Sequence, residues 1–511
     1  MEGKCKYLVV VDIPGIKEYV FGTDKIVEIR GASTLLKRVN EEFILKFLSE
    51  DQKLPVNKVF AGGGSGHFIV EAEEMKLVEA LSKLKVHVLK ESKGGFSIVS
   101  GYSEYFEEKY DESQRNAHFS LEKDKDENPF SYAVPIHTGY IRECERCSGE
   151  ASTFKKFHKE DADLHALCVV CAQKLISGKD KKSGPWKEFS GYLRDRGFDC
   201  RLPKDFEEIG AECRAKKGYT ALVYADGNDM GKIFQKIKKR EEYESISNMI
   251  EKSVRDACWE SIIEVSRIET YKQKNNVLPA AILLMGGDDL LVYLAADIAI
   301  PFAISVANKF SEKARAHNLS LSLGISFGKS HTPISIMVNQ AEELLRSAKK
   351  SRLKNNQQNN TTSSEAYIDY HLASDFNQID VQSSRLNHLT LEGNYRTDSE
   401  RYYLKLYQKP YSLSELKVLW DSANNLLQSG IASTKLRQFG YAPTLGKMNG
   451  TLEFLRTFTR LNYEQRGEIT KALSKFCGKS GEILWREQKD ENCDTTVLMD
   501  LIELTEFIKK T

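Results

Sequence analysis

The sequence lacks a long hydrophobic run, an excess of charge of one sign and a dense set of cysteines. Nothing in it approaches about 18 consecutive apolar residues, so no transmembrane helix is expected. Lys and Arg number 74 and Asp and Glu 73, and a net charge of +1 excludes binding of nucleic acid by bulk charge, although local basic stripes remain possible. Ten cysteines in 511 residues are too few for a disulfide scaffold. With no signal peptide at the start of the sequence, these absences favour a cytoplasmic globular protein.

The length and the pattern of short apolar runs predict an α+β protein with several domains. At about 150 residues per domain, the length corresponds to three or four domains. Two segments repeat the order βαββαβ, which predicts two ferredoxin-like domains. The predicted divisions are 1–135 for the first of these, 136–212 for a cysteine-containing insertion, 213–390 for the second, and 391–511 for a helical domain.

The two βαββαβ segments share their landmarks. In each, a β-branched strand ends at an aspartate, Asp12 or Asp226, and a glycine-centred hairpin follows. Asp12 precedes Gly63 by 63 − 12 = 51 residues, and Asp226 precedes Gly286 by 286 − 226 = 60 residues. An internal duplication explains this agreement.

The spacing of apolar residues predicts the same succession of strands and helices in both βαββαβ segments. Pro301 and Pro333 are expected at the first positions of their helices, where a missing N–H costs nothing. The polar segment 355–364 is expected to be a mobile loop, and the leucine spacing from Ser412 onward predicts helices whose residues reveal no function. The expected strands are 7–11, 59–61, 67–70, 96–99, 221–225, 281–285, 290–293 and 319–327, and the expected helices 16–21, 33–48, 75–85, 243–266, 301–316 and 333–350.

The strongest catalytic signal is Gly286-Gly287-Asp288-Asp289 in the second predicted hairpin. Neighbouring strands of a βαββ unit would bring Asp226 to the hairpin tip, where its carboxylate could share magnesium or manganese with the two hairpin aspartates. Gly227, Gly286 and Gly287 would let the backbone approach a triphosphate. Two such ions could activate a ribose hydroxyl and stabilise a pyrophosphate leaving group. A Gly- and Asp-rich turn is the structural alternative, but the flanking apolar strands and the upstream aspartate favour a metal site.

Asp229 and the first hairpin leave alternatives open. Asp229 could be a further metal ligand or a helix cap. Gly63-Gly64-Ser65-Gly66 takes the place of the acidic hairpin in the first copy and has no carboxylate, so Asp12 alone would be a weak metal site. The first copy could bind a nucleotide or position an acceptor for the second copy, or it could be a purely structural degenerate copy.

Four cysteines have the spacing of a zinc site. Cys144-x-x-Cys147 is followed after 20 residues by Cys168-x-x-Cys171. Four thiolates close the coordination shell, so the expected zinc is structural. His158 and His165 lie between the pairs and would be spare ligands at most.

Two basic stretches have different interpretations. The stretch 236–240 is interpreted as a solvated helix face. The stretch 346–354 closes the helix that follows the acidic hairpin unit, so Lys349 or Lys350 could reach a triphosphate.

Together these motifs resemble the large, polymerase-like subunit of type III CRISPR effector complexes over nearly the whole length. The acidic hairpin alone would not separate the chain from diguanylate cyclases. The resemblance implies two palm domains that face each other and bind two ATP molecules, with the second palm joining ATP into cyclic oligoadenylates when target RNA is bound. It places Asp226, Asp288 and Asp289 on the metals, and Ser33 with Gly63 and Gly64 near the acceptor nucleotide. The matching pieces are 12–16, 30–33, 62–66, the cysteine insertion, 226–231, 286–289 and the helical C-terminal part.

The chain departs from the family pattern at its beginning. Many members start with an HD nuclease domain, whereas here the first palm starts within ten residues of Met1 and none of the ten histidines precedes an aspartate. A form without this domain and without DNase activity is therefore expected. The balanced charge implies that guide and target RNA are held mostly through other protein subunits. Two alternatives remain: the same chemistry making an adenylylated small-molecule conjugate, and a non-catalytic scaffold.

Overall fold

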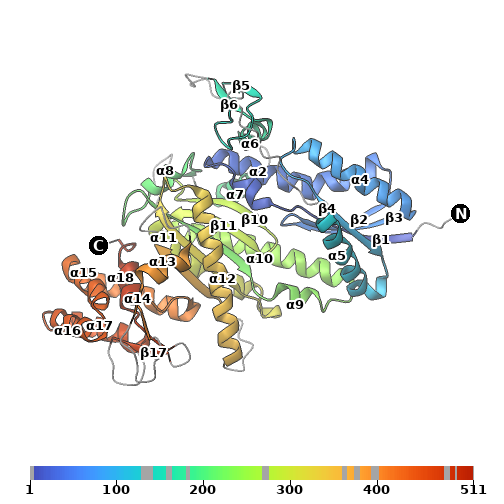
Figure 1. The fold of residues 1–511 in the computed structure, drawn as a ribbon. Helices are drawn as coiled ribbons and strands as arrows, with labels where there is room; N and C mark the ends of the chain where they lie inside the picture. Colours follow the sequence, from blue (N-terminus) through green and yellow to red (C-terminus); the bar gives the residue numbers. More distant parts are fainter. Residues whose placement is uncertain are drawn as a thin grey trace.

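Two sheets with the same strand order form the centre of this computed structural model (Figure 1). The first has the order β2-β3-β1-β4, and the second has β10-β11-β8-β12, extended by β13 and β16. This is the ferredoxin-like order, so the predicted α+β class with two palm domains is confirmed. The strands are β1 Cys5–Asp12, β2 Val56–Gly62, β3 Ser65–Ala72, β4 Val99–Glu104, β8 Tyr219–Gly227, β10 Ala280–Gly286, β11 Asp289–Ala295, β12 Leu321–Lys329, β13 Tyr367–Leu372 and β16 Tyr411–Ser412.

The structure describes most of the chain and gives each palm its own helices. The first has α1 Ile16–Phe21, α2 Ile26–Arg38 with a helical continuation to Asp51, α4 Glu74–Glu91 and α5 Tyr110–Glu127. The second has α9 Met230–Phe234, α10 Arg240–Ser266, α11 Ala296–Lys313 and α12 Ile334–Gln358. The described residues are 5–127, 142–156, 164–179, 185–198, 200–266, 276–358, 365–372, 380–392, 402–476, 484–488 and 492–509.

The strand register aligns the two palms residue by residue. Asp12 lies opposite Ser65, and Ala225 opposite Leu290, which brings Asp226 beside Asp289. Each hairpin also has a register shift on its first strand, at 58–60 and at 282–284. Gly62-Gly63-Gly64-Ser65 is therefore the counterpart of the acidic hairpin. The expected alignment starting at Gly63 is wrong by one residue, because three successive glycines leave the start of the hairpin open in the sequence.

A glycine in the last strand of each palm admits the following helix. A Cβ on Gly101 of β4 would overlap the backbone oxygen of Ala117 in α5, and a Cβ on Gly324 of β12 would overlap the oxygen of Ala341 in α12. The two glycines are in equivalent registers, opposite Val10 and Tyr224. The two copies therefore share this close packing of a helix against the last strand of the palm, α5 on β4 and α12 on β12.

Gly324→Ala is expected to destabilise the chain by about 1–3 kcal/mol, because α12 must move off the sheet. Thermal unfolding measures this effect. Gly467→Ala, at a half-buried helix position where a new Cβ meets nothing within 4 Å, should raise stability slightly. Equal melting temperatures for the two variants would contradict the close packing.

Helix boundaries differ from the expected ones at two prolines and one loop. Pro333 lies just before the first residue of α12, Ile334, and not inside the helix. α11 starts at Ala296, so Pro301 lies inside the helix and not at its first position. Burial of Ala299 and Ile300 offsets the hydrogen bond that Pro301 cannot donate. α12 continues to Gln358, so 355–358 are helical and not a loop; 359–364 lie outside the described residues.

The cysteine insertion and the C-terminal part complete the fold. The insertion projects beside α2 at the top of Figure 1 with strands β5 Thr153–Lys155 and β6 His165–Leu167 and helix α6 Val169–Lys179. Its helices α7 Pro185–Asp195 and α8 Phe206–Ala211 lie lower, against the second palm. The helical C-terminal part also has a small sheet, β14-β15-β18-β17, which the leucine spacing did not predict. Its elements are β14 Thr390–Glu392, β15 Tyr403–Lys405, β17 Arg486–Gln488, β18 Cys493–Thr495, α14 Leu413–Gln428, α15 Ser433–Tyr441, α16 Lys447–Phe458, α17 Tyr463–Phe476 and α18 Leu498–Thr505.

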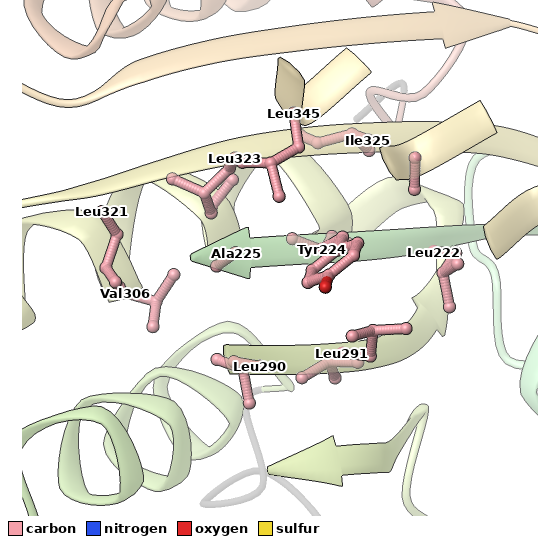
Figure 2. Close-up of a cluster of buried hydrophobic side chains, with 14 of the residues drawn as sticks. Leu222, Tyr224, Ala225, Leu290, Leu291, Val306, Leu321, Leu323, Ile325 and Leu345 are labelled. Carbon is pink, nitrogen blue, oxygen red and sulfur yellow. The ribbon is translucent and has the colours of Figure 1, made fainter. Parts of the chain in front are cut away.

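The core of the second palm fixes the strand that carries Asp226. Figure 2 shows β8 between β11 and β12, with apolar side chains on all three strands. Ala225, Leu290 and Leu323 are fully buried. None of the described helices is long and apolar enough to cross a membrane.

Candidate active site between the two palms

Three aspartates meet at the tip of the second hairpin. Asp226 is the next-to-last residue of β8 and lies beside Asp289, the first residue of β11. Asp288 occupies the turn between β10 and β11. Gly287 precedes it with φ of 62°, a left-handed conformation that favours glycine. A Cβ on Gly227 would lie 2.7 Å from Oδ2 of Asp288, so glycine there leaves room for the carboxylate.

The electrostatics of this tip indicate uncompensated negative charge. Burial, followed by the charge of Asp226, raises the pKa of Asp288 to about 6. Burial and the neighbouring carboxylates of Asp226 and Asp288 raise the pKa of Asp289 to about 7. Tyr224, two residues before Asp226 and on the same face of β8, donates a hydrogen bond to Asp289 over 3.3 Å. Residues two apart on a strand lie on the same face, so the sequence alone could have placed Tyr224 beside the aspartates.

Two cations from α12 face the loop after β8. Lys349 pairs with the Asp226 carboxylate and also donates to the Gly227 carbonyl oxygen over 3.1 Å. Arg352 pairs with Asp229 at 2.6 Å. Lys350 is exposed on the next position of the helix and makes neither contact. Of the two lysines selected from the sequence, Lys349 therefore lies at the aspartates.

Asp229 does not cap the following helix. It has a φ of 58° at the start of α9, and its side chain makes no capping hydrogen bond. The carboxylate is held by Arg352 and, at 2.7 Å, by Lys232. These ion pairs make the cap interpretation wrong, while the ligand interpretation stays a prediction.

The chemistry of the tip suits a hard divalent cation. Three carboxylates supply the oxygen ligands that magnesium prefers, and burial with the neighbouring carboxylates raises the pKa of Asp288 and of Asp289. On binding such an ion, Asp226 would coordinate it in place of the ion pair with Lys349. Among the described residues, only the four cysteines bring three or more metal-binding donor atoms within 4.8 Å of one another.

A cavity of about 700 Å³ lies between the palms on one side of the tip. Its size falls in the range of nucleotide-sized ligand sites. The first palm contributes Ser33, Gly63 and Gly64, and the second contributes Gly286 and Asp289. The residues expected from the sequence to lie near an acceptor are thus brought beside the acidic hairpin.

The two palms contact each other at two points beside this cavity. Ser33 in α2 donates a hydrogen bond over 2.7 Å to the carbonyl oxygen of Leu283, the residue at the register shift of β10. The hairpin tips meet at Gly63 and Gly286, where a Cβ on Gly286 would lie 2.8 Å from the Gly63 backbone. Side chains at these two positions would force the palms apart.

A second cavity of about 530 Å³ lies on the other side of the hairpin. Gly287, Asp288 and Asp289 line it together with side chains of both palms. The acidic tip therefore faces two cavities, each large enough for one nucleotide. The remaining contributors that sequence reasoning missed include Phe234 and Tyr243 of the second palm and Gln114, Arg115 and His118 of the first.

The first palm has a related but incomplete site. Lys125 lies eight residues after Ala117 in α5, as Lys349 lies eight residues after Ala341 in α12. Burial raises the pKa of Asp12 and the charge of Lys125 lowers it, so this aspartate also faces a lysine. The hairpin opposite Asp12 carries Gly64 and Ser65 in place of carboxylates. The first palm thus lacks two of the three acidic groups.

The four cysteines of the insertion bring their sulfur atoms together in one cluster. The sulfur atoms of Cys147 and Cys168 are 3.7 Å apart, which matches the edge of a tetrahedron with Zn–S bonds of about 2.3 Å. All four sulfur atoms lie within 4.8 Å of one another, so the site fits zinc. His165 bonds to Glu145 at 2.8 Å and supplies no ligand, and His158 lies outside the described residues.

The cysteine cluster is fastened to the helix that carries Ser33. Arg146, between the first two cysteines, pairs at 2.8 Å with buried Glu28 of α2. Helices α2 and α6 approach so closely that a Cβ on Gly31 or Gly178 would overlap the other backbone. Lys174 of α6 donates to the Tyr19 carbonyl oxygen of α1. The insertion therefore sets the position of one wall of the larger cavity.

Comparison with known proteins gives the family of the second palm. Residues 219–358 match the family described as Cas10/Cmr2, second palm domain. No curated protein matches the chain. Solved structures of Csm1 share its fold: the Csm1–Csm4 cassette in complex with cA4 (14% identity, TM-score 0.59), the cassette in complex with one ATP (15%, 0.57) and Csm1 in T. onnurineus (14%, 0.57).

These similarities cover nearly all of this chain. The alignments include 98%, 99% and 98% of its residues and 70% of each of those structures. In other Csm1–Csm4 structures the share of the matched chain is 54%. The recognition made from the sequence is thus confirmed for the palm-domain family and the fold.

Proposed function

Since the chain carries the second palm domain of the Cas10/Cmr2 family on a Csm1 fold, we propose that it is a metal-dependent nucleotidyltransferase of type III CRISPR antiviral defence. ATP is the adenylyl donor, and with ATP alone a second ATP is the acceptor. Repeated transfer and ring closure, while target RNA is bound, yield cyclic oligoadenylates. The observation that carries this proposal is the three-aspartate tip between two nucleotide-sized cavities.

The residues divide into a donor side and an acceptor side. Asp226, Asp288 and Asp289 would hold magnesium or manganese, which would polarise the reacting oxygens and neutralise the leaving pyrophosphate. Lys349, released from Asp226, would bind the phosphates of the donor as a point charge. Ser33 and the Gly63–Gly64 turn would keep the acceptor cavity closed against the hairpin.

The proposed setting follows from the relatives and the charge. Other protein subunits of a type III effector complex would bind the chain and present guide and target RNA, because a net charge of +1 gives it little hold on RNA. Zinc would have a structural role, and cysteines kept reduced for it would suit a cytoplasmic protein.

Lys349→Gln is expected to raise the KM for ATP about tenfold, because one charged contact to the donor is worth about 1.4 kcal/mol. Lys350→Gln is the matched control, since it removes the same charge one position along α12. Steady-state pyrophosphate release by the assembled complex measures both. Equal KM values for the two variants would contradict the role of Lys349.

Incubation of the complex with ATP, magnesium and target RNA tests the proposal itself. Oligoadenylates and pyrophosphate are the expected products. Failure of the complex to bind ATP with magnesium at millimolar concentration would favour a non-catalytic scaffold.

A further inference from the structure

A third cavity, of about 440 Å³, lies within the second palm and is lined by neither of the hairpin aspartates. Its walls come from the loop after β8, the turn that leads into β12 and the last turns of α12. The volume is large enough for one small ligand. None of the steps proposed for adenylyl transfer uses this cavity.

Helix α9 and the turn after it separate the third cavity from the second cavity at the acidic tip. Phe234 and Gln235 line the second cavity, whereas Ile233 and Lys236 line the third. Backbone hydrogen bonds from Gln235 to Gly231 and from Lys236 to Ile233 continue the helical turn past the end of α9. At about 100° per residue, the two pairs of side chains lie on opposite faces of this turn. A ligand in the third cavity is therefore not the ATP bound at the tip.

The third cavity has a surplus of positive charge. Three lysine and arginine side chains line it, and Asp229 is the single carboxylate in its lining. Arg352 and Lys232 both pair with that carboxylate, at 2.6 and 2.7 Å. Lys236 is exposed and has no ion-pair partner among the described residues. A ligand with two or more negative charges would therefore be attracted to this cavity.

One buried donor in the cavity lacks an acceptor. Arg352 is 5% exposed, and a terminal nitrogen of its guanidinium donates to Asp229. Its Nε finds no acceptor among the described residues. A buried donor without an acceptor is costly, and a guanidinium is well shaped to donate to phosphate oxygens. A phosphate at this point would supply the missing acceptor.

The remaining lining suits a nucleoside better than an inorganic anion. Ile233, Leu319 and Leu353 contribute apolar side chains. Leu353 is 45% exposed, directly after buried Arg352 in α12. The side-chain amide of Asn318 also lines the cavity. Apolar contact combined with an amide hydrogen bond is a common way to bind a base.

We infer that the third cavity binds a nucleoside diphosphate or triphosphate that is distinct from the transferred ATP. The phosphates lie among Lys232, Lys236 and the Nε of Arg352, and the base packs on Leu319 and Leu353. Lysine and arginine, rather than carboxylates, meet the phosphates, so no divalent ion is required. Binding here does not depend on the proposed adenylyl transfer.

Calorimetry on the assembled complex, without magnesium, ATP or target RNA, tests the inference. ADP is the probe, and adenosine and pyrophosphate are its controls, since each lacks one part of the ligand. ADP should bind at least about tenfold more tightly than either control, which corresponds to about 1.4 kcal/mol. Binding of adenosine or pyrophosphate as tight as that of ADP would overturn the inference.

Variants locate the bound ADP. Lys236→Gln should weaken ADP binding about tenfold, and this exposed side chain can be changed without breaking a buried ion pair. Lys239→Gln, which removes the same charge at an exposed position outside the cavity, should leave ADP binding unchanged. Arg115→Gln, which removes a cation from the second cavity, should also leave it unchanged.

The outcomes separate this site from the active site. Weaker ADP binding in Arg115→Gln with unchanged binding in Lys236→Gln would place ADP at the acidic tip and overturn the inference. Equal affinities in Lys236→Gln and Lys239→Gln would overturn it as well. A complex that binds ADP at Lys236 but makes no product from ATP would count against the proposed function alone.

Discussion

Replacing Asp288 and Asp289 together by asparagine is expected to lower adenylyl transfer at least about 1,000-fold, which corresponds to about 4 kcal/mol of transition-state stabilisation. Two of the three carboxylates at the hairpin tip are lost, so the variant cannot hold the ions that the reaction requires. Pyrophosphate release by the assembled complex is the measurement. Residual activity within tenfold of the unmodified complex would place the active site elsewhere.

The same double substitution should stabilise the metal-free chain. Burial raises the pKa of Asp288 to about 6 and of Asp289 to about 7, from ordinary values near 3.8. The folded chain therefore binds these protons more tightly than the unfolded chain, and its stability falls as the pH rises from about 4 through 7. Asparagine does not titrate, so the variant does not lose this stability as the pH rises.

Thermal unfolding without divalent ions measures this gain. Discounted for partial exposure of the hairpin, it should be about 1–2 kcal/mol at pH 8, or a few degrees in Tm, and smaller at pH 5. Magnesium should reduce the difference in Tm between the variant and the unmodified chain, because it stabilises the unmodified chain. A lower Tm for the variant at pH 8 would show that the carboxylates are structural.

Removal of zinc is expected to have the second large effect. Structural zinc sites contribute an apparent 10–16 kcal/mol or so of binding energy, and the cluster between Cys144 and Cys171 should hold one ion per chain. A Cys144→Ser, Cys171→Ser double variant should contain no zinc and should bind acceptor at least about tenfold more weakly. Metal analysis and calorimetry give the two quantities independently.

The loss of acceptor binding follows from the contacts of the insertion with α2. Arg146 would no longer be held against Glu28, and α6 would lose its anchor beside Gly31. Amide hydrogen exchange should therefore increase in α2 and much less in α12. Cys5→Ser, in the first strand and outside the cluster, is the control. Zinc-free chain with unchanged exchange in α2 would contradict this coupling.

The sequence predicted the features that depend on local patterns. Two βαββαβ segments, an acidic hairpin and four cysteines each have a periodicity or a spacing that is visible without a structure. Short strands such as Cys493–Thr495 have too few residues for a period of two to be detected. The position of Pro301 was wrong because burial of the preceding residues, a tertiary effect, extended the helix.

The cavities could not be predicted because each is shared between palms. Asn40 and Glu251 are 251 − 40 = 211 residues apart and line one cavity. The sequence also could not show which of Lys349 and Lys350 faces the aspartates, because that depends on how α12 is oriented against β8. The offset of one residue between the two hairpins became visible only from the strand register.

The intact masses of the nucleotide products test the central claim most directly. The complex is incubated with ATP labelled in the α-phosphate, magnesium and target RNA. We predict that the label enters phosphodiesters of adenosine, with one pyrophosphate released per bond formed, and that the Asp288→Asn, Asp289→Asn variant makes none. Release of inorganic phosphate as the sole product, or equal products from that variant, would contradict the account.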